Sequence, residues 1–590
     1  MKKTKRRIIL LLLVLVLLIS AVIILCSQPK DIAILYTNDI HTYIDGPLSY
    51  DNLAAIKKEL EKDYAHVLLV DAGDHVQGTS YGSLDEGRTI TELMNAAGYD
   101  AASLGNHEFD YGMDGCMRII DEADFPYVAS NFYRLDNGAR GENVTESFVS
   151  FPCGDEVVAF VGIITPEAFE PIYFRDAEGN YTHGISGGAD GAELYGDVQR
   201  AIDEAEAAGA TTIIALGHVG NDFVTSFWAS SDIIANTHGL DAFIDGHSHV
   251  TTKGEHISDR DSCDVLLTQT GEYFNRIGLM VIDEDSGEIE TDFIECVPLL
   301  AEDGETVTGY ELQSTLYDGK ERLSDPAVSA IKEAWMAEID KQLGQKIGTA
   351  AVTLDNYDGE IRLVRSQESN TGDFAADALY YLFDNLDMDV DIAVINGGGI
   401  RNKALTGELT YKSCKDIHTF GNVACLQTVS GQQLLDALEW GCRGVGSGEE
   451  IGAFLQVAGL TYEIDTGVPC TVQRDENGLW TGGPTGGYRV CNVQVYNRET
   501  QAYEPLDPDA SYNLAGYNYI LRDMGDGFAM FGDAVNVLDY VMEDYMVLAN
   551  YVEGFENGVV DAANAPLLTK YPGMLLDYSD VNGSGRIVIH

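Results

Sequence analysis

Basic residues are scarce in this chain of 590 residues. It contains 36 Lys and Arg against 95 Asp and Glu, which gives a formal net charge of −59 at pH 7. Proteins that bind DNA or RNA place clustered Lys and Arg side chains against the phosphate backbone. A surface this acidic repels DNA, RNA and anionic lipid on average, so the composition excludes nucleic-acid polymers as partners.

Proline is also infrequent, and internal repeats and low-complexity tracts are absent. The chain has 14 Pro, while 45% of its residues are hydrophobic and 9% are aromatic. This apolar content is enough to bury hydrophobic cores, so the composition excludes an intrinsically disordered chain. At about 100–200 residues per domain, the length predicts more than one domain.

Two kinds of cysteine motif are missing. The chain has no Cys-x-x-Cys pair and no Cys/His zinc spacing. Nine of the ten cysteines follow residue 30, so at least one of these nine is unpaired. We expect small buried side chains, with one or two disulfides at most.

The first 30 residues differ from the rest of the chain. Five basic residues at positions 2–7 precede an uncharged apolar run from Ile8 to Cys26. A helix of that length spans about 30 Å, the thickness of a bilayer's hydrocarbon core. The positive-inside rule places residues 1–7 in the cytoplasm and the chain after Lys30 outside. We interpret residues 1–30 as a basic tail and a retained membrane anchor; a cleaved signal peptide and a secreted protein are the alternative.

The pattern after the anchor predicts an α/β fold. In residues 31–324, short apolar strands (IAILY, HVLLV, TIIAL, DAFI) end in polar clusters, and helical stretches at 50–62 and 191–207 lie between them. Residues 325–343 have the apolar spacing of a helix, which we interpret as a linker between domains. Residues 344–590 form a second unit, with helices at 373–386 and 431–440 and a strand-rich segment at 455–516.

Five polar clusters carry metal-binding side chains: NDIH (38–41), AGDH (72–75), GNHEFD (105–110), GHVG (217–220) and GHSH (246–249). Four of them directly follow an apolar strand, where open α/β sheets place their sites. Hard or borderline divalent cations prefer carboxylate, amide-oxygen and imidazole ligands. The predicted ligands are Asp39, His41, Asp74, Asn106, His218, His247 and His249.

All five clusters, in this order, resemble the calcineurin-like metallophosphoesterases. The resemblance implies a β-sandwich flanked by helices and two divalent ions, which could be zinc, manganese, cobalt or magnesium. Asp74 would bridge the two ions, and a hydroxide held between them would attack the phosphorus. One ion would be bound by Asp39, His41, Asp74 and His249, and the other by Asp74, Asn106, His218 and His247.

The same resemblance implies roles for two further residues of the GNHEFD cluster. His107, beside the predicted ligand Asn106, would donate a proton or hydrogen bond to the leaving oxygen. Asp110, three residues further on, would orient His107 and stabilise its protonated form.

The second unit carries the segment DIAVINGGGIR (391–401), together with ESNTGDFAADAL (368–379), TFGN (419–422) and GDGF (525–528). These motifs resemble the C-terminal domain of the 5′-nucleotidase and UDP-sugar hydrolase family, so the resemblance covers nearly all of residues 31–590. It implies a separate domain of helices and sheets that binds the nucleotide. The implied nucleotide contacts are Asn396, Gly398, Arg401, Phe420 and Asp526. Of these, Phe420 would stack on the base.

The chain departs from the family pattern at two of these positions. Animal ecto-5′-nucleotidases have an arginine immediately before the equivalent of Glu368, where this chain has Gln367; Arg365 is the predicted replacement. The usual second aromatic, six residues before the Asp of the GDG motif, is Ile520 here, and the adjacent Tyr519 is predicted to complete the base clamp.

The leading hypothesis is an outward-facing 5′-nucleotidase that converts nucleoside 5′-monophosphates to nucleoside and phosphate, with domain closure about the 325–343 helix. A 2′,3′-cyclic nucleotide phosphodiesterase or a UDP-sugar or dinucleotide hydrolase is the alternative, and a catalytically silent nucleotide-binding surface protein is a second. The last segment, DVNGSGRI (580–587), matches half of a calcium loop, but the chain ends before the position-twelve carboxylate. We therefore predict a closing loop and a terminal strand there.

Overall fold

The computed structural model describes residues 31–590, except for residues 170–172, 177–178, 222–226, 285, 302–306, 360, 476–477, 533, 539–540 and 562–563. The predicted anchor, residues 1–30, lies outside the described residues. Among those that are described, no helix has both the length and the apolar character needed to cross a membrane. No disulfide joins the nine cysteines of the described part of the chain.

The N-terminal half contains two mixed sheets. The first has the order β16-β15-β14-β1-β2-β3-β4, in which β1, β2, β3 and β4 are parallel. Its strands are β1 (Ile32–Thr37), β2 (His66–Asp71), β3 (Ala101–Ser103), β4 (Tyr127–Val128), β14 (Arg276–Ile282), β15 (Ile289–Leu300) and β16 (Val307–Gln313). The second has the order β12-β13-β11-β10-β8-β7. Its strands are β7 (Phe148–Cys153), β8 (Glu156–Ile164), β10 (Thr212–His218), β11 (Ala242–Ile244), β12 (Thr251–Ser258) and β13 (Asp264–Thr270).

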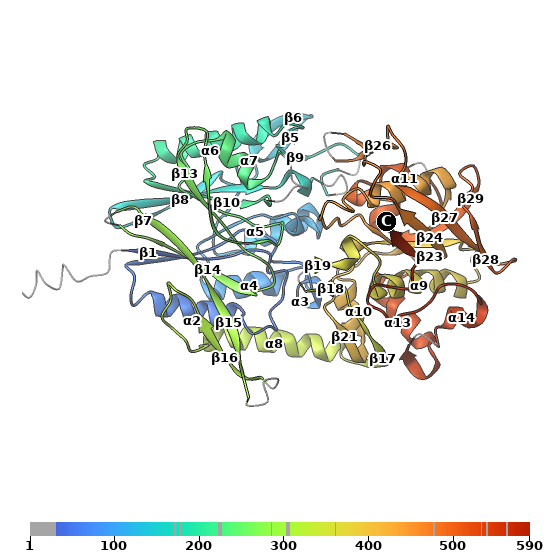
Figure 1. Ribbon diagram of the computed structural model, residues 1–590. Helices are drawn as coiled ribbons and strands as arrows, with labels where there is room; N and C mark the ends of the chain where they lie inside the picture. Colours follow the sequence, from blue (N-terminus) through green and yellow to red (C-terminus); the bar gives the residue numbers. More distant parts are fainter. Residues whose placement is uncertain are drawn as a thin grey trace, which may run out of the picture.

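The two sheets pack face to face and helices cover their outer faces (Figure 1). Side-chain alternation along β1 explains the layers, because Ile32, Ile34 and Tyr36 enter the core between the sheets, whereas Ala33 and Leu35 face the helices. Helices α2 (Tyr50–Leu60), α4 (Arg88–Ala97) and α5 (Gly112–Glu122) cover the first sheet, and α6 (Ala192–Ala207) and α7 (Ser230–Asn236) cover the second. The predicted β-sandwich flanked by helices is confirmed.

The predicted linker helix is α8 (Pro326–Leu343), which begins where the Asp325 side chain accepts hydrogen bonds from two backbone amides. It lies against α2 and α4 and runs along one side of the molecule toward the C-terminal half (Figure 1). Trp335 Nε1 donates to the Tyr81 carbonyl at 2.7 Å, and Lys332 pairs with Asp51. The helix is therefore fixed to the N-terminal half. The exact domain limits stay a prediction.

The C-terminal half contains three main sheets, with the orders β23-β20-β29-β22-β30, β28-β27-β24-β32 and β21-β17-β31. The first consists of β20 (Ile392–Asn396), β22 (Ala424–Ser430), β23 (Leu455–Ala458), β29 (Ser511–Tyr517) and β30 (Val535–Leu538). The others consist of β24 (Leu460–Ile464), β27 (Val490–Asn497), β28 (Ala502–Pro505), β32 (Ile587–Ile589), β17 (Lys346–Leu354), β21 (Leu405–Thr410) and β31 (Val559–Val560). Helices α9 (Asn370–Asn385), α11 (Gly431–Gly441) and α13 (Asp544–Gly554) pack on these sheets.

The chain ends in a strand, as predicted, because β32 pairs in parallel with β24. Arg586, directly before it, is buried and donates to both carboxylate oxygens of Asp377, at 2.9 and 2.7 Å. Glu368 accepts backbone N–H groups from Ser584, Gly585 and Ile587. The segment 368–379 therefore anchors the C-terminus, a structural role that its resemblance to the family did not indicate.

Candidate active site

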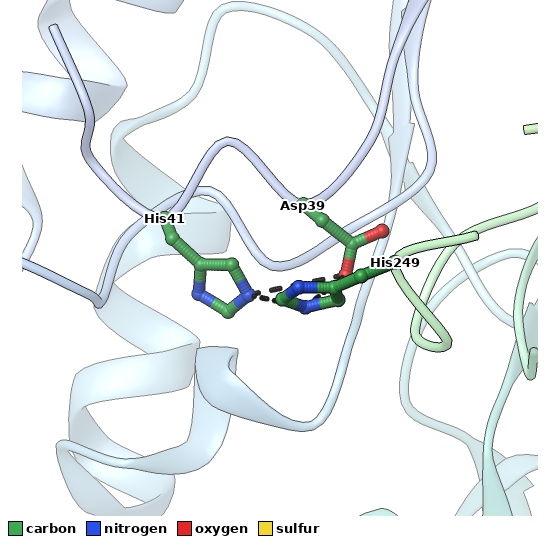
Figure 2. Close-up of side chains that lie close together, drawn as sticks. All are labelled: Asp39, His41 and His249. Atoms are coloured by element: carbon green, nitrogen blue, oxygen red, sulfur yellow. Dashed lines mark hydrogen bonds and ion pairs between the residues drawn. The ribbon is translucent and has the colours of Figure 1, made fainter. Parts of the chain in front are cut away.

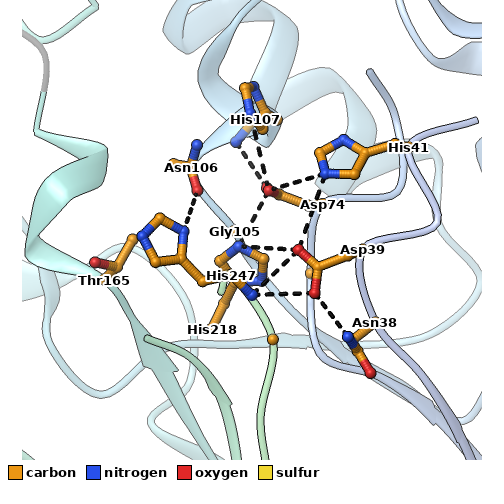
Figure 3. A network of polar contacts seen from close by, with 12 residues as sticks. Asn38, Asp39, His41, Asp74, Gly105, Asn106, His107, Thr165, His218 and His247 are labelled. Atoms are coloured by element: carbon orange, nitrogen blue, oxygen red, sulfur yellow. Dashed lines mark hydrogen bonds and ion pairs between the residues drawn. The ribbon is translucent and has the colours of Figure 1, made fainter. Parts of the chain in front are cut away.

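The predicted metal ligands come together where strands of both sheets end. Asp39 and His41 follow β1, Asp74 follows β2, Asn106 and His107 follow β3, His218 is the last residue of β10, and His247 and His249 follow β11. Figure 3 shows these side chains, apart from that of His249, pointing toward one another from loops that belong to different strands, and Figure 2 shows His249 beside Asp39 and His41. The strand-end clusters of the sequence thus form one site.

The loops that carry these residues are sharply bent. Five of the seven predicted ligands have positive φ: Asp39 (50°), His41 (48°), Asp74 (59°), His247 (80°) and His249 (57°). Left-handed backbone is uncommon for residues other than Gly, and such strain is concentrated at functional sites. The turns explain how residues two apart in the sequence converge on one centre.

The ligand atoms form two neighbouring groups. In the first, the His249 Nε2 lies 3.1 Å from the His41 Nε2 and 3.3 Å from the Asp39 Oδ1 (Figure 2). In the second, the His247 Nδ1 lies 2.9 Å from the Asn106 Oδ1.

Asp74 lies between the two groups. Its Oδ2 is 3.7 Å from the His41 Nε2 and 3.1 Å from the His218 Nε2. Asp74 therefore lies near one histidine of each predicted ligand set. How the ligands divide between two ions stays a prediction.

In each of the four predicted histidine ligands, the ring nitrogen that faces away from the centre contacts an oxygen acceptor. His41 Nδ1 lies 2.9 Å from the Gln77 carbonyl, and His218 Nδ1 lies 2.7 Å from the Ala72 carbonyl. His247 Nε2 lies 2.9 Å from the Glu167 carboxylate, and His249 Nδ1 contacts the Glu272 carboxylate. Since these oxygens only accept hydrogen bonds, each ring carries its proton there and turns its remaining nitrogen to the centre, as in metal sites.

The donor set fits divalent cations. The His218 Nε2 is buried and has no well-formed hydrogen bond, although Asp74 is close. Burial and the charge of Arg401 hold the pKa of His41 well below its ordinary value, which keeps the ring neutral. Burial lowers the pKa of His218, but the carboxylates of Asp74 and Asp39 raise it to about 10, so a cation there competes with a proton.

The glycines of the motifs let the loops approach closely. A Cβ on Gly105 would lie 2.2 Å from the Asp74 Oδ1. Glu108, also in the GNHEFD cluster, accepts the backbone N–H groups of Asp74 at 2.9 Å and of Gly105 at 2.6 Å. Its carboxylate therefore joins the loop of Asp74 to the loop of Asn106, a role that sequence reasoning missed.

His107 and Asp110 form the predicted pair. The His107 Nδ1 lies 2.7 Å from the Asp110 Oδ2, and Tyr173 donates to the other carboxylate oxygen at 3.3 Å. The His107 Nε2 lies 4.0 Å from the Asp74 Oδ2, so it faces the centre. The pair can hold a proton next to a group bound at the metal ligands.

A cavity of about 1240 Å³ lies over this centre, between the two halves of the chain. Its wall includes His107, Asp110, Asn106, His247 and His249 on the N-terminal side. All seven predicted substrate residues lie on the opposite side: Arg365, Asn396, Gly398, Arg401, Phe420, Tyr519 and Asp526. The structure therefore brings together both sets of residues, whose individual roles stay predictions.

Asp526 is the centre of a small polar group in this wall. It accepts a hydrogen bond from Asn396 Nδ2 at 2.7 Å, and its carboxylate and backbone amide lie 3.4 and 3.2 Å from the Tyr519 hydroxyl. Burial raises the pKa of Asp526 above its ordinary value. Ile520 is buried in the hydrophobic core, so the neighbouring Tyr519, and not Ile520, lines the cavity.

Phe420 and Arg401 lie where the two halves meet. The Phe420 ring is 6.0 Å from the His107 ring and 5.7 Å from the Arg401 guanidinium carbon. Arg401 Nη2 is 3.3 Å from the His41 Nδ1, and Gln77 donates to Thr419, beside Phe420, at 2.8 Å. Residues of the nucleotide-binding motifs therefore directly contact residues of the metal motifs.

Sequence reasoning missed several charged groups of the site. Arg362, Arg443 and Arg474 line the cavity, but none belongs to a motif that we singled out. Glu167 and Glu272 were also missed, although Glu272 directly follows the TQTG end of a strand, the same signal that marked the ligands.

Two family descriptions match the two halves. Residues 32–251 match the calcineurin-like phosphoesterases, and residues 346–533 match the 5′-nucleotidase C-terminal domain. The chain is 25% identical over 565 residues to the 5′-nucleotidase of Bos taurus, covering 89% of each protein. It is 26% identical to the trifunctional nucleotide phosphoesterase protein YfkN of Bacillus subtilis, covering 90% of this chain and 34% of that longer protein.

Among solved structures, the fold is similar to that of a 5′-nucleotidase precursor from Thermus thermophilus. The TM-score is 0.72 at 24% identity, and the match covers 95% of this chain and 99% of that one. The fold and the site define a hydrolase of the metallophosphoesterase class. Within that class, the chain belongs to the 5′-nucleotidase family, which joins a calcineurin-like domain to a 5′-nucleotidase C-terminal domain.

Proposed function

We propose that this protein is a two-metal 5′-nucleotidase that releases phosphate from nucleoside 5′-monophosphates. The observation that carries the proposal is that predicted metal ligands and residues of the C-terminal motifs line one and the same cavity. The Bos taurus relative, named a 5′-nucleotidase, aligns with both halves and supports the same substrate class.

Two divalent ions, when bound at the seven ligands, polarise the phosphoryl oxygens and stabilise the negative charge of the transition state. The other steps belong to side chains. Arg401 pairs with the phosphate while a water molecule attacks the phosphorus. The bond from phosphorus to the leaving oxygen breaks, and His107, held by Asp110 at 2.7 Å, donates a proton to that oxygen. Asn396 and Asp526 bind the nucleoside by hydrogen bonds.

The charges that line the cavity explain why metals are needed for an anionic substrate. Among the residues that the structure describes, six arginines and seven Asp or Glu residues line it, so these side chains carry 6 − 7 = −1. The buried ligands Asp39 and Asp74 add two negative charges, while two divalent ions add four positive ones. The loaded site is then cationic although the whole chain carries −59.

Replacing Phe420 with Ala is expected to raise KM for AMP by about 5–150-fold, because stacking of an aromatic ring on a base contributes about 1–3 kcal/mol. Steady-state kinetics would measure this change, with Phe420→Tyr as the matched control that keeps the ring. An unchanged KM in Phe420→Ala would remove this side chain from the nucleoside pocket.

A larger phosphoester, such as a dinucleotide, a sugar nucleotide or a 2′,3′-cyclic nucleotide, is the second candidate substrate. The cavity of about 1240 Å³ exceeds the usual size of small-molecule pockets, about 300–1000 Å³, which leaves room for a second group. The partial match to YfkN, a nucleotide phosphoesterase by name, supports this alternative.

A substrate panel on the full-length protein decides between these functions. We expect phosphate release from AMP, GMP, CMP or UMP in the presence of Mn²⁺, Zn²⁺, Co²⁺ or Mg²⁺. Rapid cleavage of cyclic nucleotides, dinucleotides or sugar nucleotides with negligible release from monophosphates would favour the second candidate. Nucleotide binding without any hydrolysis would indicate a catalytically silent binding protein.

We propose that both halves face outward from the cell membrane, held by residues 1–30. The support is the basic cluster at positions 2–7 and the apolar run that follows it. Fractionation of cells that express the full chain should place it in the membrane, with the C-terminal half open to external protease. A protein found entirely in the cytoplasm would contradict this location, and one released with a new N-terminus would indicate cleavage.

A further inference from the structure

The four histidine ligands fall into two pairs according to what fixes them. His41 and His218 have fully buried side chains and contact main-chain carbonyls. His247 and His249 are 16% and 11% exposed and contact carboxylates. The first pair is therefore positioned by the backbone, whereas the second pair depends on the side chains of Glu167 and Glu272.

Glu167 lies outside all the sequence motifs of the site. It belongs to a short 3₁₀ turn, Pro166–Ala168, that follows β8 and begins at Thr165. Its backbone amide donates to the Thr165 hydroxyl at 3.2 Å, which fixes the turn, and its Oε2 lies 2.9 Å from the His247 Nε2. The opposite nitrogen of that ring, Nδ1, is the one that faces Asn106.

Glu167 also faces cations of the C-terminal half. Glu167, Arg443 and Arg474 line the same cavity. The positive charges of Arg443 and Arg474 act on the Glu167 carboxylate across this cavity.

Arg443 in turn lies close to the nucleoside-binding residues. Its guanidinium carbon is 4.1 Å from the centre of the Trp440 ring, and Trp440 Nε1 donates to the Asp526 carbonyl at 2.8 Å. Glu167 therefore contacts a predicted metal ligand and lines the same cavity as a cation of the C-terminal half.

We propose that Glu167 is a positioning residue that orients His247 for metal binding and links this histidine electrostatically to Arg443 of the C-terminal half. A carboxylate that accepts the proton on Nε2 fixes the tautomer with a free Nδ1 and makes that nitrogen a better ligand. The inference rests on the proposed two-metal function and assigns one of the two metal sites a dependence on the opposite domain.

The first test measures metal binding, not activity. Full-length metal-free protein is titrated with Mn²⁺ or Zn²⁺ in a calorimeter. Glu167→Ala is expected to weaken one of the two sites by about 10–100-fold and to leave the other within about twofold. Glu167→Gln, which keeps an oxygen acceptor and the side-chain shape but loses the charge, is expected to fall between Glu167→Ala and the wild type.

The matched control is Glu450→Gln. Glu450 lines the same cavity but pairs with Arg362, at 2.8 Å, so both metal affinities should stay unchanged. Two wild-type affinities in Glu167→Ala would overturn this inference while leaving the proposed function intact. A wild-type protein that binds fewer than two ions would contradict the proposed function itself, and this inference with it.

The second test is a double-mutant cycle with Glu167→Gln and Arg443→Met. The effect of Arg443→Met on the affinity of the weakened metal site is measured once in the wild type and once in Glu167→Gln. If the two side chains interact, these two fold-changes differ by at least about twofold. Equal factors in both backgrounds would overturn the link between the domains.

Discussion

Replacing Asp74 with Ala is expected to lower the turnover of AMP by at least about 10³-fold. Asp74 lies 3.1 Å from the His218 Nε2 and 3.7 Å from the His41 Nε2, so its loss should weaken both of the proposed metal sites. Divalent ions supply several kcal/mol of charge stabilisation, and each 1.36 kcal/mol is a factor of about ten in rate.

The expected loss is checked by steady-state kinetics and by metal content in the same preparation. Asp121→Ala is the control, because Asp121 is an exposed residue of α5, outside the site. It should keep both metals and full turnover. A variant Asp74→Ala with two bound ions and normal turnover would show that this carboxylate does not bridge.

Replacing His107 with Ala is expected to lower AMP turnover by about 10²–10⁴-fold while both metals stay bound. His107 is not one of the seven predicted ligands, and its ring is held toward the centre by Asp110 at 2.7 Å. Asp110→Asn is expected to reduce turnover as well, because an amide no longer stabilises the protonated ring.

The leaving group makes this second prediction specific. A nucleoside leaves as an alkoxide that needs a proton, whereas a nitrophenolate leaves without one. The defect of His107→Ala should therefore be much smaller for a nitrophenyl phosphate ester than for AMP. Equal defects for both substrates would mean that His107 does not donate the proton to the leaving oxygen.

The convergence of the predicted metal ligands could be foreseen from the sequence because these residues follow strands. The carboxyl ends of neighbouring parallel strands meet at one edge of a sheet, so Asp39, Asp74 and Asn106 had to lie close together. The ligand pairs 39/41 and 247/249 required bent loops, and the positive φ angles provide them. Local pattern and sheet geometry were sufficient here.

Other parts of the site could not be predicted because folding brings them together from distant segments. Glu167 is 80 positions from His247, and Arg443 comes from the other half of the chain. Neither has a local pattern that distinguishes it from an ordinary surface residue. The helix 325–343 was predicted, but its periodicity could not indicate that Trp335 fixes it to the N-terminal half.

The acidic composition excluded nucleic acid but described the site poorly. Of the chain's 36 basic residues, six that the structure describes line one cavity, and these six are arginines. Arginine's planar group pairs with phosphate in a fork and stays charged when partly buried. A net charge averages over the surface and does not report such a local arrangement.

The most direct test of the two-metal account is phosphate release from AMP by the full-length protein before and after chelation. We expect chelated protein to be inactive, and two equivalents of a divalent ion per chain to restore turnover, with half-restoration or less at one equivalent. Turnover that survives complete removal of metal, or full turnover with one ion bound, would contradict the account.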